Sequence, residues 1–183
     1  MKNFLFLADG FEEIEALATL DVLRRAEMDV ETVSITHSTF VTGAHGLTVQ
    51  ADKTFKEADF SGTDWLILPG GMPGAKNLHE FGALNDLLKV HAGKGRIAAI
   101  CASPAVVLAA TGILEGRKAT CYPGFETALI AAGADYVEAD RVVVADNIVT
   151  SNGPSSAVPF ALKIVELTRG KEVADSVAAG MLC

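Results

Sequence analysis

The sequence predicts an α/β fold in which helices cover a mostly parallel central sheet. Short apolar runs alternate with longer stretches of helical periodicity, which is typical of βαβ units. The 183 residues are 50% apolar, enough to bury a core, and no repeat, low-complexity tract or change in composition divides them. We therefore expect one domain over residues 1–183, an open sandwich of helices on a sheet.

The elements of the first half follow from apolar spacing. Phe4–Ala8 is an apolar run that predicts the first strand, and Ile14–Met28 carries apolar residues at three-residue spacing, which predicts a helix. Trp65–Leu68 is continuously apolar, as expected for a strand that is buried on both faces. The other elements expected here are a strand at Val30–Ile35, an edge hairpin at Val41–Ala51 and a helix at Ala83–His91.

In the second half, the strand Ile97–Ile100 is followed by a helix over Pro104–Ala110. Proline in the first helical turn costs nothing, because that position has no intrahelical N–H partner. The remaining elements expected are a helix near Glu126–Ala132, strands at Val142–Ala145 and Ile148–Thr150, and two closing helices after Ser155 and Lys171.

Charge and cysteine content narrow the choice of partner and compartment. The chain has 15 Lys and Arg against 23 Asp and Glu, a formal net charge of −8, which disfavours nucleic acid and anionic membranes as partners. We expect a small molecule or another protein instead. Cys101, Cys121 and Cys183 are widely spaced and form no C-x-x-C pair, which predicts free thiols in a reducing, cytoplasmic setting. The run at Phe4–Ala8 is too short for a secretory signal.

Four turns follow the carboxyl ends of predicted strands, where open parallel sheets bind their ligands. They are Asp9–Glu15, Pro69–Gly74, Cys101–Pro104 and Ser151–Pro154. The histidines His37, His45, His79 and His91 lie outside these turns, and no metal-ligand spacing occurs, so we expect neither a metal site nor a cofactor.

Cys101 stands where an apolar strand runs into a helix, the arrangement of a nucleophile elbow, with Ala99 and Ser103 where the G-x-S-x-G motif has glycine. A sulfur at a helix N-terminus is expected to have a lowered pKa and to favour the thiolate. Free cysteines are also often buried and inert. The residues alone leave both interpretations open.

Two neighbouring features have a structural and a functional interpretation. Gly70–Gly71 predicts a tight turn, although the Gly71 N–H can join that of Ala102 in binding a developing negative charge. The acidic cluster Glu12–Glu15 opens a helix, where carboxylates favour the helix dipole, and the residues do not show which one points inward. A carboxyl group beside a thiolate in an apolar site has a raised pKa and can donate or accept a proton.

Five motifs together resemble the ThiJ/PfpI superfamily, most closely the branch of the parkinsonism-associated protein deglycase and its bacterial relatives. They are Gly10–Glu15, Asp21–Ala26, Leu68–Gly71, Ala98–Pro104 and Thr150–Pro154, and they span the chain in order. The resemblance implies a flavodoxin-like three-layer sandwich, a single ThiJ/PfpI-type domain that works as a homodimer, and a strained elbow.

The resemblance also implies roles for particular residues. Cys101 would be the reactive cysteine, Glu15 its protonated, hydrogen-bonded partner, and the N–H groups of Gly71 and Ala102 the oxyanion site. The pocket would further include Gly70, Tyr122, Pro154, Arg25 and His45.

The chain departs from the family pattern at three positions. Tyr122 stands where members often have histidine, and tyrosine is a poor base near neutral pH. Ala102 stands where the protease branch has histidine, which disfavours proteolysis. His45 replaces an arginine that family members have in the early hairpin, and Arg25 matches an interface arginine. We therefore expect the pocket to keep a cation that is weaker and more pH-sensitive than is usual in the family.

The resemblance and these residues together imply an enzyme that acts on small dicarbonyls such as methylglyoxal without glutathione, of the glyoxalase or deglycase type. Cys101 would attack the aldehyde, and Glu15 would move the proton between adjacent carbons. The alternative is a sensor or stress chaperone in which Cys101 oxidises to sulfinic acid. A weaker alternative, from family naming, is thiazole monophosphate (thiamine) biosynthesis, for which no phosphate-binding motif is visible.

Overall fold

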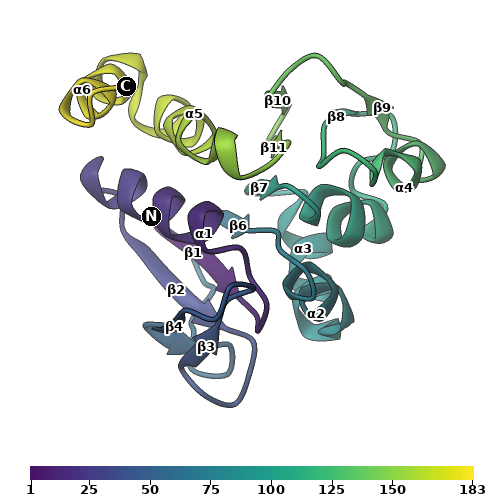
Figure 1. Cartoon of the computed structure of the whole chain (residues 1–183), viewed down its shortest axis with the longest axis horizontal. Helices are drawn as coiled ribbons and strands as arrows, with labels where there is room; N and C mark the ends of the chain where they lie inside the picture. The colour runs from purple at the N-terminus through teal and green to yellow at the C-terminus, as the bar shows by residue number, and fades with distance from the viewer.

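A sheet of seven strands lies between two layers of helices in the computed structural model, which describes residues 1–183 (Figure 1). In chain order the strands are β1 Lys2–Leu7, β2 Val30–Ser34, β3 Phe40–Thr42, β4 Thr48–Gln50, β5 Lys53–Thr54, β6 Thr63–Leu68, β7 Arg96–Ile100, β8 Lys118–Ala119, β9 Asp135–Tyr136, β10 Val142–Ala145 and β11 Ile148–Ser151. The helices are α1 Glu13–Arg25, α2 Gly74–Glu80, α3 Gly82–His91, α4 Glu126–Ala131, α5 Ala157–Arg169 and α6 Lys171–Gly180.

The order of the strands places the functional edge of the sheet. It runs β10-β11-β7-β6-β1-β2-β5, and only the pair β10–β11 is antiparallel. Five of these strands are parallel and longer than β5, and across the sheet they lie in the order β2, β1, β6, β7, β11. Renumbered 1 to 5 by their order in the sequence, they give the flavodoxin-like order 2-1-3-4-5. The expected α/β, flavodoxin-like fold is confirmed. The connections reverse direction between β1 and β6, and ligands bind at such a switch point.

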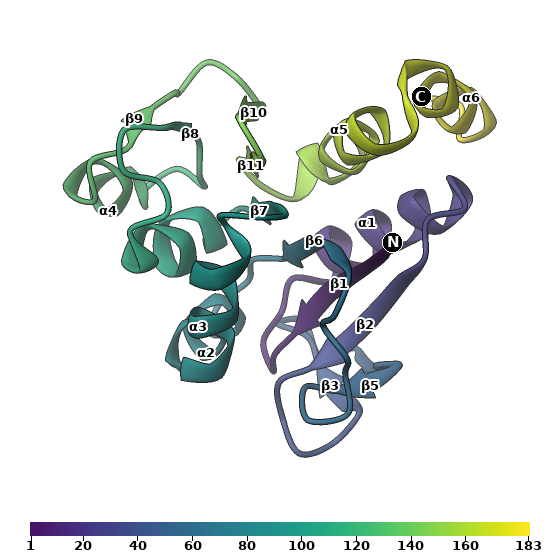
Figure 2. The ribbon, with the colours of Figure 1, turned by 180° about the vertical axis from the view of Figure 1, so that it is seen from behind.

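Alternate side chains of the central strands build one core on each face of the sheet. In β1, Leu5 and Leu7 pack with residues of α1 and α5, whereas Phe4 and Phe6 pack with residues of α2 and α3. Figures 1 and 2 show α1, α5 and α6 together on one side of the sheet and α2, α3 and α4 on the other. Burial on both faces explains why these strands are continuously apolar in sequence.

Several elements differ from the sequence expectation. The helix after Cys101 is not a regular α-helix, because Pro104–Leu108 forms a π-helical turn and Ala109–Thr111 a 3-10 turn. The first helix ends at Arg25 rather than Met28, and Glu27 takes a left-handed conformation. The short elements α2, β5 and β9 were not expected. None of the helices combines the length and apolar character that crossing a bilayer requires.

Candidate active site

The turns that follow β1, β6 and β7 are joined by hydrogen bonds at the switch point. The Glu12 N–H donates to the carbonyl of Gly70 at 3.0 Å, and the Gly74 N–H donates to the carbonyl of Gly10 at 3.0 Å. The buried Ser103 hydroxyl donates to the carbonyl of Pro69 at 2.5 Å. These bonds hold three sequence-distant turns in one rigid arrangement.

Cys101 occupies a strained elbow directly after β7. Its φ is +64°, in the left-handed region that a residue with a Cβ seldom adopts. Two bonds hold it there: the Cys101 N–H donates to the carbonyl of Ser151 at 2.8 Å, and the Tyr122 N–H donates to the carbonyl of Cys101 at 2.8 Å. The side chain is therefore fixed at the carboxyl edge of the sheet, and Cys101 is 8% exposed.

Glu15 is the member of the acidic cluster that points inward. The Glu12 side chain caps α1 by accepting a hydrogen bond from the Glu15 N–H at 2.7 Å, which fixes the first helical turn. The Glu15 residue is 0% exposed, and its Oε2 accepts from the Gly70 N–H at 2.8 Å. Its Oε1 has no hydrogen-bond partner, and the carboxyl group lies close enough to the Cys101 thiol for each group to shift the pKa of the other.

The two groups determine each other's protonation. Burial raises the pKa of Glu15 to about 7, while hydrogen bonds from Cys101 and Gly70 oppose the rise. Burial and then the negative charge of Glu15 raise the pKa of Cys101 to about 12, although the N–H groups of Gly71 and Ala102 lower it. The sequence predicts a lowered pKa for the Cys101 thiol. That prediction is wrong, because an ionised Glu15 and burial raise the pKa instead. The pair has the form of a thiol next to a carboxylate base.

Gly70 and Gly71 are required for different reasons. At Gly71, φ is +86° and an added Cβ would lie 2.4 Å from the Glu12 nitrogen, so only glycine fits. Its N–H and that of Ala102 face the Cys101 sulfur and lower the pKa of the thiol, so they are placed to stabilise an oxyanion. Gly70 instead provides space, because an added Cβ would lie 2.6 Å from the Cys101 Cβ and 2.8 Å from Glu15 Oε2.

The substitution Gly70→Ala is expected to separate Cys101 from Glu15 while the fold persists. Displacing a reacting group by about 1 Å costs about 10²-fold in rate, so we expect a loss of that size in a reaction that needs both groups. Simple alkylation of Cys101 should instead accelerate, because the negative charge that raises the thiol pKa moves away. The measurement is the rate of Cys101 alkylation, followed by mass spectrometry. Gly82→Ala is the matched control, because a Cβ there meets nothing within 4 Å. Equal alkylation rates in the two variants would contradict this account of Gly70.

The other expected pocket residues lie at different distances from this centre. The Tyr122 backbone N–H is hydrogen-bonded to Cys101, and the Tyr122 ring lies beside Gly153. A Cβ added to Gly153 would be 3.1 Å from the Tyr122 ring. Pro154 begins the turn after β11. Arg25 lies ten positions beyond Glu15 on α1, about 15 Å along the axis, and pairs with Asp21 at 2.7 Å. Within one chain, Arg25 therefore does not reach the pocket, and its expected place there as an interface arginine of a dimer stays a prediction.

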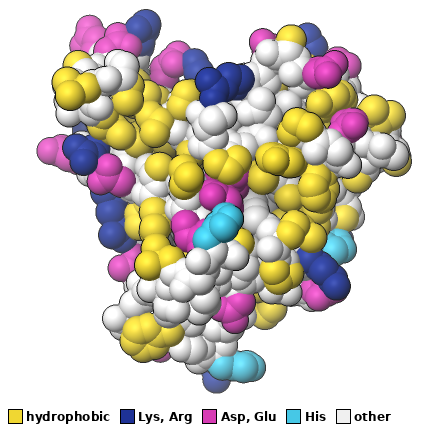
Figure 3. Space-filling view, in the orientation of Figure 1, with side chains coloured by type: hydrophobic (Ala, Val, Ile, Leu, Met, Phe, Trp, Pro, Cys, Tyr) yellow, Lys and Arg dark blue, Asp and Glu magenta, His cyan; other side chains and the backbone are white.

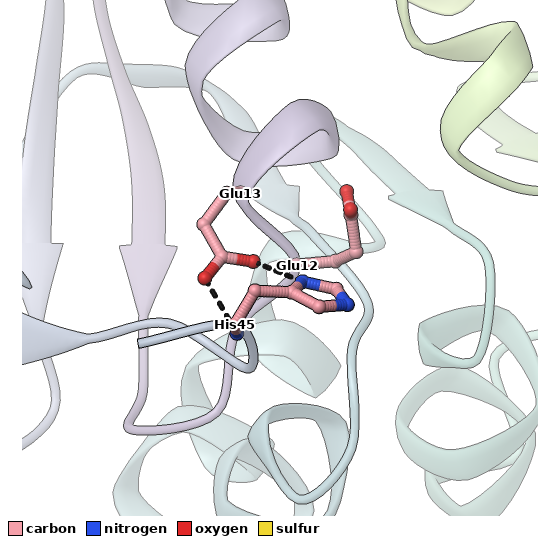
Figure 4. Close-up of side chains that lie close together, drawn as sticks. All are labelled: Glu12, Glu13 and His45. Atoms are coloured by element: carbon pink, nitrogen blue, oxygen red, sulfur yellow. Dashed lines mark hydrogen bonds and ion pairs between the residues drawn. The ribbon is translucent and has the colours of Figure 1, made fainter. Parts of the chain in front are cut away.

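His45 lies in the turn between β3 and β4 and binds the first turn of α1 (Figure 4). Glu13 Oε1 accepts from the His45 N–H at 2.7 Å, and Glu13 Oε2 lies 2.7 Å from His45 Nδ1. Gly43 leaves room for this carboxylate, since an added Cβ would lie 2.4 Å from Glu13 Oε1. The bond to Glu13 raises the pKa of His45. Sequence reasoning missed the pair because 32 positions separate its members.

Comparisons with known proteins identify the family of this chain. A model of the DJ-1/PfpI family matches residues 1–167. The chain belongs to the DJ-1/PfpI family. Protein DJ-1 homolog A of Arabidopsis thaliana is 40% identical over 177 residues, covering 96% of this chain and 45% of that protein. The glutathione-independent glyoxalase DJR-1.2 of Caenorhabditis elegans is 38% identical over 167 residues, covering 91% of this chain and 87% of that protein.

Solved structures of DJ-1/PfpI proteins have the same fold. Oxidized DJ-1 of Toxoplasma gondii superposes with a TM-score of 0.93 at 42% identity, covering 99% of this chain and 97% of that one. DJ-1beta of Drosophila melanogaster gives a TM-score of 0.94 at 36% identity, over 99% and 97% of the two chains. The chain spans less than half the length of the Arabidopsis DJ-1 homologs A and B.

Proposed function

We propose that this DJ-1/PfpI protein is an enzyme that converts small dicarbonyls such as methylglyoxal to hydroxy acids without glutathione. The observation that carries the proposal is the buried Glu15 carboxyl next to the Cys101 thiol, which a strained elbow holds in place. The similarity to a relative named a glutathione-independent glyoxalase supports it.

The proposed reaction begins with attack of sulfur on the aldehyde carbon of methylglyoxal. The Glu15 carboxylate takes the thiol proton as the C–S bond forms, and its pKa of about 7 suits a base at neutral pH. The aldehyde oxygen becomes an alkoxide that the N–H groups of Gly71 and Ala102 stabilise. Glu15 then returns the proton to this oxygen, which gives a hemithioacetal.

The same carboxylate can complete the isomerisation. Glu15 removes the proton from the former aldehyde carbon, which gives an enediolate, and delivers it to the neighbouring carbon. The hydroxyl proton of the first carbon passes to the oxygen of the second as the thioester carbonyl forms. The product is a lactoyl thioester of Cys101, which water hydrolyses to lactate and the free thiol. One carboxyl group near a pKa of 7 can accept and donate in turn, so no separate histidine is needed. This accounts for Tyr122 at the position where relatives often have histidine.

A second candidate function is a cysteine-based oxidation sensor or chaperone. Its support is that a similar solved structure is that of an oxidized DJ-1, and that Cys101 has two N–H donors and an acid group around its sulfur. The same contacts would hold the oxygens of a sulfinic acid.

The purified protein with methylglyoxal, in buffer without glutathione, distinguishes the two functions. Formation of lactate at many turnovers per chain supports the enzyme. Absence of lactate, together with selective conversion of Cys101 to sulfinic acid by peroxide, supports the sensor. Mass spectrometry of the Cys121 and Cys183 peptides provides the internal control for selectivity.

The proposal includes a homodimer, as the family resemblance implies. Ile14 at the start of α1, Phe40 of β3 and Leu47 before β4 are large apolar residues that a single chain leaves exposed. Sedimentation of the free protein at micromolar concentration measures its oligomeric state.

A further inference from the structure

A second cavity lies beside the candidate active site and is separate from it. It has a volume of about 340 Å³ and is bordered by α4, β9 and the turns that follow β8 and β11. No residue that holds or contacts the Cys101 side chain lines it. Its polar lining residues are Thr120, Cys121, Glu126, Tyr136, Glu138 and Asn152. We call this space the α4 cavity.

The α4 cavity lies away from the face that the proposed homodimer covers. Figures 1 and 2 show α4 and β9 at one end of the molecule and the β3–β4 hairpin at another. Phe40 and Leu47, two of the exposed apolar residues of the proposed dimer face, belong to that hairpin. Tyr122 marks the boundary with the active site, because its N–H is bonded to the Cys101 carbonyl, whereas Cys121, the residue before it, lines the cavity. A dimer formed through the hairpin therefore leaves the cavity open.

Two buried polar side chains of the α4 cavity have no partner. Thr120 is 1% exposed, and although its N–H donates to Thr150 Oγ1 at 3.0 Å, its own hydroxyl forms no hydrogen bond. Cys121 is also 1% exposed and is a free thiol. Burial and then the charge of Glu126 raise the pKa of this thiol to about 12, so it is uncharged at neutral pH. A buried hydroxyl without a partner costs free energy, and a ligand that donates to the Thr120 oxygen removes that cost.

The α4 cavity is negatively charged. Glu126 and Glu138 line it, no lysine or arginine does, and neither carboxylate forms an ion pair. Burial raises the pKa of Tyr136, and the charges of Glu126 and Glu138 raise it further, so both charges reach the phenol. Figure 3 shows acidic side chains among hydrophobic ones at this end of the molecule, at the upper right. Such a cavity favours a cation that also has an apolar part.

We propose that the α4 cavity binds a small primary alkylammonium compound. An ammonium group has three N–H donors, and the cavity offers acceptors on Glu126, Glu138 and the Thr120 hydroxyl. Glu126 Oε2 already accepts from the Gly124 N–H at 2.6 Å, so its Oε1 is the oxygen left for a ligand. Ile130, which is 57% exposed, supplies apolar surface for the alkyl chain. This ligand site does not depend on the proposed reaction.

Titration with n-butylamine, which is protonated at pH 7, tests the proposal, and 1-butanol is the uncharged probe of the same chain length. Binding is followed through the chemical shifts of backbone amides in NMR spectra of the whole protein. A unit charge about 4 Å from an opposite one in water strengthens binding about fivefold, so in about 10 mM buffer we expect n-butylamine to bind at least about fivefold more tightly than 1-butanol. The amides of Thr120, Cys121 and Tyr136 are expected to shift, and added salt is expected to weaken the binding.

Variants assign the binding to the carboxylates and the hydroxyl. Glu126→Gln keeps an oxygen for the Gly124 N–H and is expected to weaken the binding of n-butylamine about fivefold. Thr120→Val keeps the size of the side chain and the N–H bond to Thr150, and the loss of a hydrogen bond to a charged group is expected to weaken binding about tenfold. Glu172→Gln on α6 is the matched control, because it removes the same charge away from the cavity, and it is expected to leave the affinity unchanged.

Equal affinities for n-butylamine and 1-butanol would overturn the proposal. An affinity that neither Glu126→Gln nor Glu138→Gln changes would also overturn it, as would shifts confined to Gly70 and Cys101, which would place the amine in the candidate active site. Nα-Acetyl-lysine amide that binds as tightly as n-butylamine would add lysine side chains to the ligands, whereas weaker binding would restrict them to free amines, and the ammonium site stands in both cases. The test does not use lactate formation, so failure of the proposed enzyme leaves its outcome unchanged.

Discussion

Replacement of Cys101 by serine is expected to lower kcat/KM for methylglyoxal by at least about 10³-fold, the scale on which enzymes lose activity with their nucleophile. Serine keeps the size of the side chain and the backbone bonds that hold the elbow. Its hydroxyl is far less acidic than a thiol, and a Glu15 carboxylate with a pKa of about 7 is too weak a base to compensate. The measurement is lactate formation at several methylglyoxal concentrations.

The matched control for this variant is Cys183→Ser, because Cys183 is exposed near the end of the chain and lies outside the site. It is expected to keep wild-type turnover. Thermal unfolding of Cys101→Ser verifies that the loss is chemical. If Cys101→Ser keeps more than about a tenth of the wild-type activity, the covalent mechanism is wrong, even if the wild-type protein does convert methylglyoxal to lactate.

The fold could be predicted from the sequence because its signals are local. Strands such as Trp65–Leu68 are buried on both faces, so they appear as unbroken apolar runs, and the turns that follow them contain glycine and proline. The short helix α2 escaped notice since it has only seven residues and two buried apolar side chains, Ala75 and Leu78. So short a segment gives no periodicity.

The candidate site could be located from sequence, but its electrostatics could not. The turn after β7 indicated Cys101 as the candidate nucleophile, and family resemblance chose Glu15 among three acidic neighbours. The thiol pKa was expected to fall because a helix starts nearby. Burial and the charge of Glu15 raise the thiol pKa instead, and they outweigh the effect of the helix. Both depend on the packing of α1 against the turn after β6, which the sequence does not show. The Glu13–His45 pair likewise exists only through tertiary contact.

The variant Glu15→Gln is expected to lose turnover by about 10²- to 10⁴-fold, the usual contribution of a general acid–base group. Glutamine keeps an oxygen for the Gly70 N–H, so the pocket retains its shape. In the wild type, turnover is expected to rise with pH through about 7, as the Glu15 carboxylate forms, and this inflection is absent from the variant. Lactate formation between pH 5.5 and 8.5 provides the measurement.

The same substitution should make the thiol more reactive and the protein more stable. Removing the negative charge beside Cys101 removes one cause of its raised pKa, so alkylation by iodoacetamide accelerates while turnover falls.

The gain in stability follows from the raised pKa of Glu15, which is about 7 in the folded state against 4.5 normally. Between these values the folded state binds more protons than the unfolded state, so the wild type loses stability as pH rises through this window, by up to about 3 kcal/mol. Glu15→Gln escapes that loss, and urea unfolding at pH 5 and pH 8 measures it. A variant that loses turnover, thiol reactivity and stability together would show that Glu15 supports the fold instead of exchanging protons with Cys101.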